Sequence, residues 1–249
     1  MSLLLQPSER FAGSQLPASF RWYWDDAERR AFLAADGASS AAKIPSDGYT
    51  HTLLFALHTS ASGTQLLLGL KLRGFGASTY NGIGGKLLPG ETPLTSILRE
   101  THEEIHVRLS PQHVHLVGRV TINVDGGENI CIAVYTAQFD ESMTKQVQQS
   151  DEIQPHWFDI GDVADDASWN SLPTQAMRPE HKIYLAPLLH HTVQREAGGI
   201  RALIDVHVDF NAEPSKDALA PAERPENHRT VRQWSLDVIH AAEGDTRPT

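Results

Sequence analysis

The sequence predicts an α/β (α+β) fold, an α/β/α sandwich around a mixed central sheet. Short β-rich apolar runs recur between residues 50 and 240, at least one helix with an apolar face interrupts them, and turn residues separate them. With 249 residues, of which 40% are hydrophobic, the chain can bury one sizeable core. We therefore expect one domain at 50–240, an N-terminal extension at 1–49 of unassigned role, and a tail at 241–249.

The expected strands are apolar runs bounded by turn residues. They cover residues 52–57, 65–72, 113–124, 129–139, 155–160, 200–210 and 230–239. Between the second and third of them, glycines crowd the loop from residue 74 to residue 85, which frees its backbone to approach a ligand.

Two helices are expected among these strands. The first begins at Thr92 and Pro93, a capping residue followed by a proline that the first helical position tolerates. Its apolar positions recur at helical spacing and predict the buried face: Leu94, Ile97, Leu98, Thr101 and Ile105. The second expected helix covers 184–194, with Pro187 interrupting it early.

Charge and hydropathy exclude several classes of partner. The net charge of -10 disfavours binding to a nucleic acid polymer, which is carried largely by Lys and Arg. No apolar stretch approaches the roughly 20 residues that span a bilayer, and the single cysteine, Cys131, fits a reducing compartment. We expect a monomer without membrane contact, in the cytoplasm and with the nucleus as a second compartment.

An acidic cluster lies on the first helix. Glu100, Glu103 and Glu104 are spaced i, i+3 and i+4, so their carboxylates share one helix face. Clustered carboxylates repel one another unless cations compensate, and Mg2+ prefers such oxygen ligands together with substrate phosphates. Arg99 can pair with a carboxylate and hold its orientation. The alternative interpretation of the cluster alone is a solvated acidic helix face.

The spacing around this cluster favours the first interpretation. Residues 85–107 resemble the Nudix box, G-x5-E-x7-R-E-U-x-E-E-x-G-U, in which U is apolar. The leading glycine and every charged position match: Gly85, Glu91, Arg99, Glu100, Glu103 and Glu104. Thr101 replaces an apolar residue, and His106 replaces the glycine at the helix end, where histidine tolerates a left-handed conformation. The resemblance implies a Nudix hydrolase.

A longer resemblance points to one branch of that family. Residues 71–86 are similar to the stretch before the box in the oxidized purine nucleoside triphosphate hydrolases, the 8-oxo-dGTPases related to MutT. Residues 150–158 and the last strand are similar as well, so the resemblance spans roughly residues 50 to 240. It does not include the first 49 residues.

The resemblance implies a set of metal ligands and catalytic residues. Mg2+, for which Mn2+ could substitute, would be held by the carbonyl of Gly84 and by Glu100, Glu103, Glu104 and Glu152. Such metal ions would polarise the phosphate and lower the pKa of an attacking water. Glu104 is the expected base or water-orienting carboxylate, with Glu152 as the second candidate, and Arg99 belongs to the same catalytic group.

The resemblance also implies where the nucleotide binds. The phosphates would lie along Gly84, Gly85 and Lys86, and the base pocket would include Thr52, Lys71, Phe75 and Asn81. Asn81 carries both a donor and an acceptor and can read a purine edge. Before Gly82, the same residue could instead cap a turn.

The sequence departs from the branch at the residues that read the base. The branch has Trp-Pro followed by two aspartates, and the best match here is Arg178, Pro179, Glu180 and His181. A second alignment uses Asp165, Asp166 and Trp169 instead.

Three hypotheses follow for the function. The first is Mg2+-dependent hydrolysis of 8-oxo-dGTP or 2-hydroxy-dATP to a monophosphate and diphosphate. This reaction would remove oxidized nucleotides from the nucleotide pool. The second is a Nudix pyrophosphatase acting on ADP-ribose or a dinucleoside polyphosphate, and the third is a non-catalytic nucleotide-binding module.

Overall fold

The computed structural model describes most of the predicted domain. It covers residues 48–124, 129–160, 171–173, 176–181, 183–185, 187–189, 202–210 and 231–240. The extension up to residue 47, the tail, and Asp165, Asp166 and Trp169 of the second alignment lie outside these residues.

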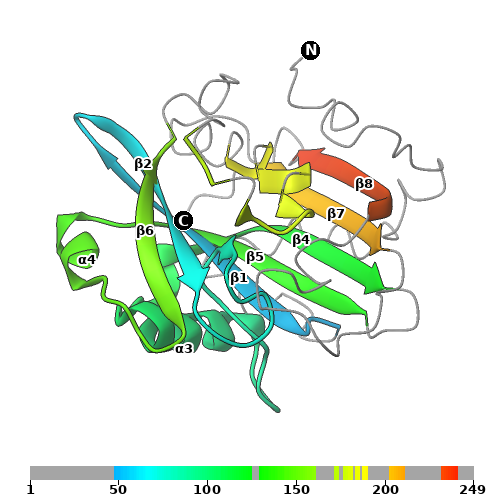
Figure 1. Ribbon diagram of the computed structural model, residues 1–249, viewed down its shortest axis with the longest axis horizontal. Coiled ribbons are helices and arrows are strands. Elements are labelled where there is room, and N and C mark those ends of the chain that lie inside the picture. Colours follow the sequence, from blue (N-terminus) through cyan, green and yellow to red (C-terminus); the bar gives the residue numbers. More distant parts are fainter. Residues whose placement is uncertain are drawn as a thin grey trace, which may run out of the picture.

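The described chain contains eight strands, the two α-helices α3 and α4, and further helical residues at 181, 183–185 and 187–189 (Figure 1). They are β1 (His51–Ser60), β2 (Gly63–Lys71), β3 (Tyr80–Asn81), α3 (Pro93–Ile105), β4 (Val114–Val124), β5 (Ile130–Gln138), α4 (Glu141–Gln146), β6 (Ile153–Asp159), β7 (Ala202–Phe210) and β8 (Val231–His240). A 3-10 turn, η5 (Pro111–His113), precedes β4. Each strand predicted from the sequence is present, with its ends within three residues of those expected.

The strands form one mixed sheet. Its order is β3-β2-β1-β5-β4-β7-β8, and β6 pairs with β2 outside this path. The pairs β1/β5 and β4/β7 are parallel, and the remaining pairs are antiparallel. The predicted mixed central sheet is confirmed.

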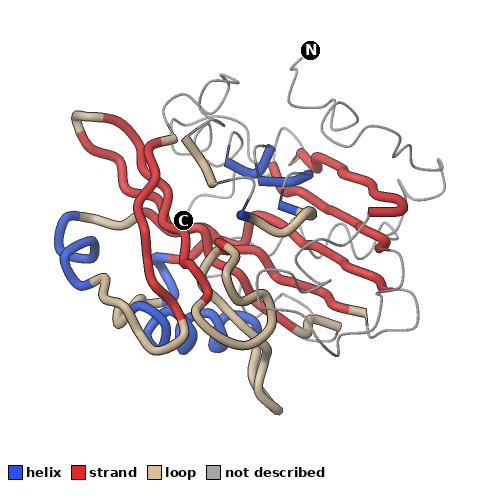
Figure 2. The backbone as a smooth tube through the Cα atoms, in the orientation of Figure 1, coloured by secondary structure: helices blue, strands red, loops and turns tan. Residues whose placement is uncertain are grey.

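Both faces of the sheet are covered (Figure 2). Side chains of β1 alternate between two apolar clusters, because successive strand residues point to opposite faces. One cluster contains Leu54 and Ala56 and packs on α3; the other contains Phe55 and packs on helical residues 183–185 and 187–189. This confirms the α/β/α arrangement.

The helix predicted at residues 184–194 begins earlier than expected. His181 is already helical, three residues before the expected start at Tyr184, and residues 190–194 of the predicted span lie outside the described residues. Pro187 lies among the helical residues and does not end the helix. Within the described residues, no helix is both long enough and apolar enough to cross a bilayer.

Helix α3 begins and ends as its sequence predicts. The Thr92 hydroxyl accepts a hydrogen bond from the Thr95 N–H, and the Thr95 side chain accepts one from Thr92 N–H in return. His106 ends the helix in the left-handed region, with φ of 63°, and its N–H donates to the His102 carbonyl. Thr101 is fully buried and donates its hydroxyl to the Ile97 carbonyl at 2.7 Å. Neither departure from the box disrupts the helix.

Two short elements were not predicted. Helix α4 is capped by Asp140 but buries none of its residues, so it carries no apolar periodicity in the sequence. Strand β3 has two residues and is defined by its pairing with β2, which sequence spacing does not reveal.

Candidate active site

A glycine segment crosses β1 at very short range. The Thr52 N–H donates to the Gly85 carbonyl at 2.9 Å, and a Cβ atom on Gly84 would lie only 2.3 Å from the Thr52 carbonyl oxygen. Gly84 also has a φ of 145°, which L side chains rarely adopt. Only glycine allows this backbone-to-backbone approach.

The same glycines lie directly on the acidic face of α3. The Gly84 N–H donates to Glu104 Oε2 at 2.8 Å. A Cβ on Gly85 would lie 2.6 Å from Glu100 Oε1. The loop and helix predicted to act together are therefore in contact.

Arg99 organises the carboxylates around this contact. Its Nε and Nη2 donate to the two oxygens of Glu91 at 2.7 and 2.9 Å, and its Nη1 lies 2.9 Å from Glu100 and 2.8 Å from Glu103. The hydrogen bonds from Arg99 lower the pKa of Glu91. One guanidinium thus fixes three acidic side chains, which is the orienting role expected of Arg99.

The three helix carboxylates differ sharply in burial. The Glu103 side chain is 56% exposed, that of Glu100 13%, and that of Glu104 4%. Burial raises the pKa of Glu100, and it raises the pKa of Glu104 to about 8. Glu104 is one of the buried residues of α3, together with Thr101 and Ile105, so it lies at the boundary of the core.

Two further charged residues face Glu104. Lys71, predicted to line the base pocket, extends its Nζ to 3.9 Å from Glu104 Oε1 at the acidic end of the site. Glu152 is near enough to contribute to the raised pKa of Glu104, and Arg73 Nη2 holds it at 2.7 Å. Arg73 also pairs with Asp151 at 3.0 Å. Arg73 is part of the stretch at 71–86, but its spacing gave no sign of this ion pair.

The donor chemistry of this end fits a hard divalent cation. Glu104 is buried, accepts one strong hydrogen bond and is repelled by Glu100 and Glu152, a combination that a bound cation would relieve. In the described part of the chain, no three His, Cys, Asp or Glu side chains already surround a single point. Arg99 and Arg73 hold Glu103 and Glu152 respectively, so enclosing an ion requires these carboxylates to turn.

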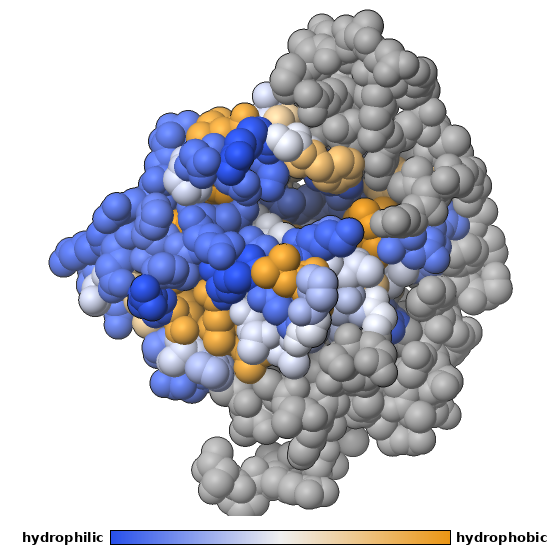
Figure 3. Space-filling model, turned by 90° about the horizontal axis from the view of Figure 1, so that it is seen from below, coloured by the Kyte–Doolittle hydropathy of each residue, from blue (hydrophilic) through white to orange (hydrophobic). Residues whose placement is uncertain are grey.

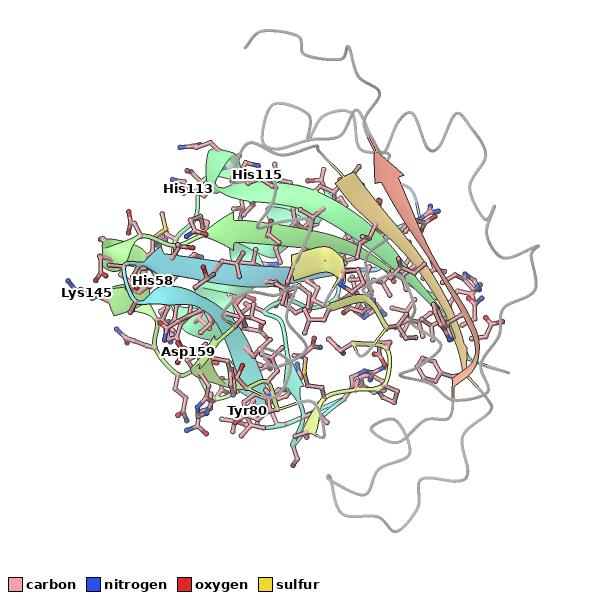
Figure 4. The ribbon with its side chains drawn as sticks, turned by 90° about the horizontal axis from the view of Figure 1, so that it is seen from above. His58, Tyr80, His113, His115, Lys145 and Asp159 are labelled. Carbon is pink, nitrogen blue, oxygen red and sulfur yellow. The ribbon has the colours of Figure 1, made fainter. Side chains whose placement is uncertain are left out.

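The predicted base-reading residues meet at the other end of the same loop. His181 Nε2 lies 2.7 Å from Asn81 Oδ1, although the two residues are 100 positions apart. Met177 forms a β-bridge with Tyr80, and the Arg178 guanidinium lies over the Phe75 ring at 4.6 Å. Figure 4 shows Tyr80 at one side of the sheet, away from His113 and His115. These contacts agree with the alignment through Pro179.

Glu180 and Arg178 form a buried ion pair in this cluster. Arg178 Nε donates to Glu180 Oε1 at 2.5 Å. Burial alone would raise the pKa of Glu180, but the charges of Arg178 and His181 lower it below its usual value. Burial lowers the pKa of His181 to about 4. Glu180 is therefore ionised and His181 neutral near pH 7.

Two predicted residues lie elsewhere. The Thr52 side chain points to the α3 face, 3.4 Å from the Ser96 hydroxyl, whereas His181 packs near Phe55 on the opposite face. Thr52 therefore supports the glycine segment and does not join the base cluster. Lys86 is exposed, and its carbonyl accepts from Arg99 Nη2 at 3.4 Å.

Exposed apolar side chains border the site. The large ones among the described residues are Leu72, Phe75 and Leu88, all in the loops that follow β2 and β3. The space-filling view from below shows a hollow on this side of the molecule, between hydrophilic and apolar surface (Figure 3). Phe75, 47% exposed above Arg178, places an aromatic ring at the surface of the base cluster.

A glycine loop set against clustered helix carboxylates is a geometry that suits metal-assisted chemistry on phosphates. The NUDIX domain model matches residues 57–177, which include that loop, α3 and β6. The chain belongs to the Nudix family and is a Nudix hydrolase.

Relatives within the family are informative about the branch. The chain is 35% identical over 121 residues to the oxidized purine nucleoside triphosphate hydrolase of Danio rerio, covering 46% of this chain and 74% of that protein. It is 31% identical over 129 residues to the protein of the same name from Mus musculus, covering 49% and 80%. The predicted resemblance to this branch is confirmed.

Among solved structures, the MutT protein from Bacillus halodurans superimposes with a TM-score of 0.50. The match covers 75% of this chain and 96% of that one, at 16% sequence identity. Such a likeness supports the fold alone.

Proposed function

We propose that this Nudix hydrolase cleaves oxidized purine nucleoside triphosphates, such as 8-oxo-dGTP or 2-hydroxy-dATP, to a monophosphate and diphosphate with Mg2+. One observation carries the proposal. Asn81 contacts His181, and Gly84, three residues later, contacts Glu104, so one short loop joins the polar cluster at 178–181 to the acidic helix. The names of the two vertebrate relatives support the same substrate class.

The acidic end provides the groups that hydrolysis needs. Mg2+ held by Glu100, Glu103, Glu104, Glu152 and the Gly84 carbonyl would neutralise phosphate charge and lower the pKa of a bound water. Glu104, buried against the Gly84 N–H between the loop and the helix, is the candidate base or water-orienting carboxylate. Lys71 lies beside it and can bind a phosphate oxygen. Arg99 positions the remaining carboxylates.

A substrate panel tests the proposal directly. With Mg2+, and with Mn2+ as its substitute, we expect the highest kcat/KM for an oxidized purine triphosphate, with monophosphate and diphosphate as products. Faster turnover of ADP-ribose than of 8-oxo-dGTP would overturn the assignment of substrate but leave the reaction class intact.

A different nucleoside diphosphate derivative is the second candidate. Arg178 and His181 stand where the branch has a tryptophan and an aspartate, and this change bears on the base and not on the phosphates. A binding module without catalysis is disfavoured, because Glu100, Glu103 and Glu104 are all retained in contact with the loop or with Arg99. A monomer in the cytoplasm remains our expectation.

A further inference from the structure

A row of polar side chains crosses two strands outside the site described above. Strands β4 and β7 are adjacent and parallel (Figure 1), and their register pairs three polar residues of each: Arg119 with Asp205, Thr121 with His207, and Asn123 with Asp209. The residues between them belong to the apolar cluster that contains Phe55, so all six polar side chains point to the opposite face, the one that carries α3. The three residues of β7 are at most 6% exposed.

The first pair of this row balances its own charge. Arg119 Nε and Nη2 lie 3.3 and 3.4 Å from the two carboxylate oxygens of Asp205. A forked contact between a guanidinium and a carboxylate compensates both charges and fixes both side chains. The rest of the row then contains a single carboxylate, that of Asp209, beside an imidazole, an amide and a hydroxyl.

Three atoms of this remaining group form a closed triangle. Asn123 Nδ2 lies 3.0 Å from Asp209 Oδ1 and 3.1 Å from His207 Nε2. His207 Nε2 in turn lies 3.1 Å from the same Asp209 Oδ1. An amide nitrogen only donates, a carboxylate oxygen only accepts, and a ring nitrogen of neutral histidine does one or the other. Each edge has the length of a hydrogen bond, but three such atoms cannot alternate as donor and acceptor around a triangle.

Every placement of hydrogen therefore leaves one mismatched edge. If His207 Nε2 carries hydrogen, it faces a second donor, Asn123 Nδ2; if it is bare, it faces a second acceptor, Asp209 Oδ1. If the Asn123 amide turns over by half a rotation, which its shape allows, the amide oxygen faces the carboxylate oxygen. Facing donors or facing acceptors are costly among buried groups, because no water competes for them.

One of these arrangements has the geometry of a metal site. With the amide turned over and Nε2 bare, Asn123 Oδ1, His207 Nε2 and Asp209 Oδ1 all present lone pairs, which a cation bound to the three would satisfy together. An octahedral ion with bonds of about 2.1 to 2.2 Å holds neighbouring ligand atoms about 3.0 to 3.1 Å apart, whereas a tetrahedral ion spreads them to about 3.4 Å. The edges of 3.0, 3.1 and 3.1 Å match the octahedral spacing.

A buried hydroxyl beside the triangle supports an ion that keeps bound water. Thr121 is the register partner of His207, points to the same face and is 4% exposed. Its Oγ1 is buried without a hydrogen-bond partner among the described residues. An octahedral ion with three protein ligands retains positions for water, and such a water can donate to Thr121 Oγ1.

We propose that Asn123 Oδ1, His207 Nε2 and Asp209 Oδ1 form a second metal site, which holds an octahedral transition-metal dication and links β4 to β7. One imidazole and two oxygens suit the ions from Mn2+ to Ni2+, with affinity rising towards Ni2+. The acidic end, which offers oxygen ligands alone, suits Mg2+ instead. The third ligand is an amide, so the site needs no third His, Cys, Asp or Glu, and it does not depend on which nucleotide is hydrolysed.

Nickel binding to the full chain tests the site without any activity. In excess Mg2+, we expect calorimetry to show one tight Ni2+ per chain, which His207→Gln weakens at least about 100-fold, because loss of even an outer-shell partner costs 10- to 100-fold. The chain has 13 histidines, so His113→Gln, on η5, is the matched control and should leave this Ni2+ in place. No tight Ni2+ in the wild type, or equal losses in the two variants, would overturn the proposal.

Asn123→Asp distinguishes a metal site from a set of hydrogen bonds. Without metal, the new carboxylate repels that of Asp209, so we expect a lower Tm in chelator than for the wild type. With Ni2+, it adds a charged ligand, so we expect affinity to rise about 10-fold and the Tm to recover. A lower Tm with no gain in Ni2+ affinity would overturn the proposal, and this result does not depend on whether His207→Gln folds.

Discussion

The two ends of the site are built differently. At the acidic end, Gly84 and Glu104 are 20 residues apart, and Arg99 joins side chains within a single helix and its preceding loop. At the base end, Asn81 and His181 are 100 residues apart, and their contact depends on the sheet. Each carboxylate of the acidic end has a partner, an arginine for Glu100, Glu103 and Glu152 and Lys71 for Glu104, whereas the base end keeps buried polar atoms without protein partners among the described residues. Most contacts of the acidic end are thus local in the sequence, with Lys71 and Glu152 as exceptions, whereas the Asn81–His181 contact is long-range.

The largest expected effect tests the acidic end. Glu104→Gln removes the buried carboxylate next to Gly84, and we expect kcat to fall by about 1,000-fold with Mg2+, within the range for losing a general base. Steady-state release of the diphosphate measures it. The exposed Glu103 provides the matched control: Glu103→Gln should cost about 10-fold. Similar losses in the two variants would show that burial does not distinguish their roles.

At the acidic end, substitutions of two neighbouring glycines should affect different properties, the stability of the fold for Gly84 and metal binding for Gly85. Gly84→Ala places a Cβ against the Thr52 backbone at an unfavourable φ, and we expect a loss of about 2 to 4 kcal/mol in the free energy of unfolding. Gly85→Ala meets only the Glu100 side chain, so it should cost less than about 1 kcal/mol while weakening Mn2+ binding about 10-fold. Urea unfolding and metal titration test both. If Gly85→Ala binds Mn2+ normally, the loop does not help to orient Glu100.

The two ends should respond to pH in opposite directions. Burial raises the pKa of Glu104 from 4.5 to about 8, so its contribution to stability is complete below pH 4.5 and is lost as the pH rises through 8. Burial lowers the pKa of His181 from 6.5 to about 4, so stability is lost as the pH falls from 6.5 towards 4. Across its pH window, each group should change the free energy of unfolding by a few kcal/mol, at most about 1.4 kcal/mol for each unit by which its pKa is shifted.

Urea unfolding in chelator from pH 4 to pH 9 measures these slopes. Above pH 6.5 only the Glu104 window applies, so Glu104→Gln should flatten the loss of stability between pH 6.5 and 8. Between pH 4.5 and 6.5 the two contributions oppose each other, so Glu104→Gln should steepen the acid-side loss and His181→Phe should abolish it. Glu103→Gln, which keeps the buried carboxylate, should retain both. A Glu104→Gln protein with the wild-type alkaline slope would refute the raised pKa.

The smallest expected effect concerns the end of α3. His106 occupies the left-handed region, which favours glycine. His106→Gly should raise the free energy of unfolding by less than about 1 kcal/mol, since the relief of strain is partly offset by the greater entropy of the unfolded chain. Thermal unfolding tests the change, and kcat should stay the same. Destabilisation would show that the histidine makes a favourable contact at the helix end.

Much of the fold could be predicted because its signals are periodic. Strands β1 and β2 appear as apolar runs, and α3 has a cap, a first-turn proline and an apolar face within 14 residues, Thr92 to Ile105. Helix α4 and β3 could not be predicted in this way. Helix α4 buries no residue and β3 has only two residues, so neither produces a periodic pattern of apolar positions in the sequence.

The sequence by itself determined the acidic cluster of α3: Arg99, Glu100, Glu103 and Glu104 have fixed spacing, and helix geometry brings such neighbours together wherever the helix lies. Only the tertiary structure decided which of them is buried, and therefore that Glu104 and not Glu103 has the raised pKa. It also decided that Thr52 faces α3 and that Asn81 meets His181. Those contacts depend on strand register and on which sheet face each side chain takes, and neither is encoded in local spacing.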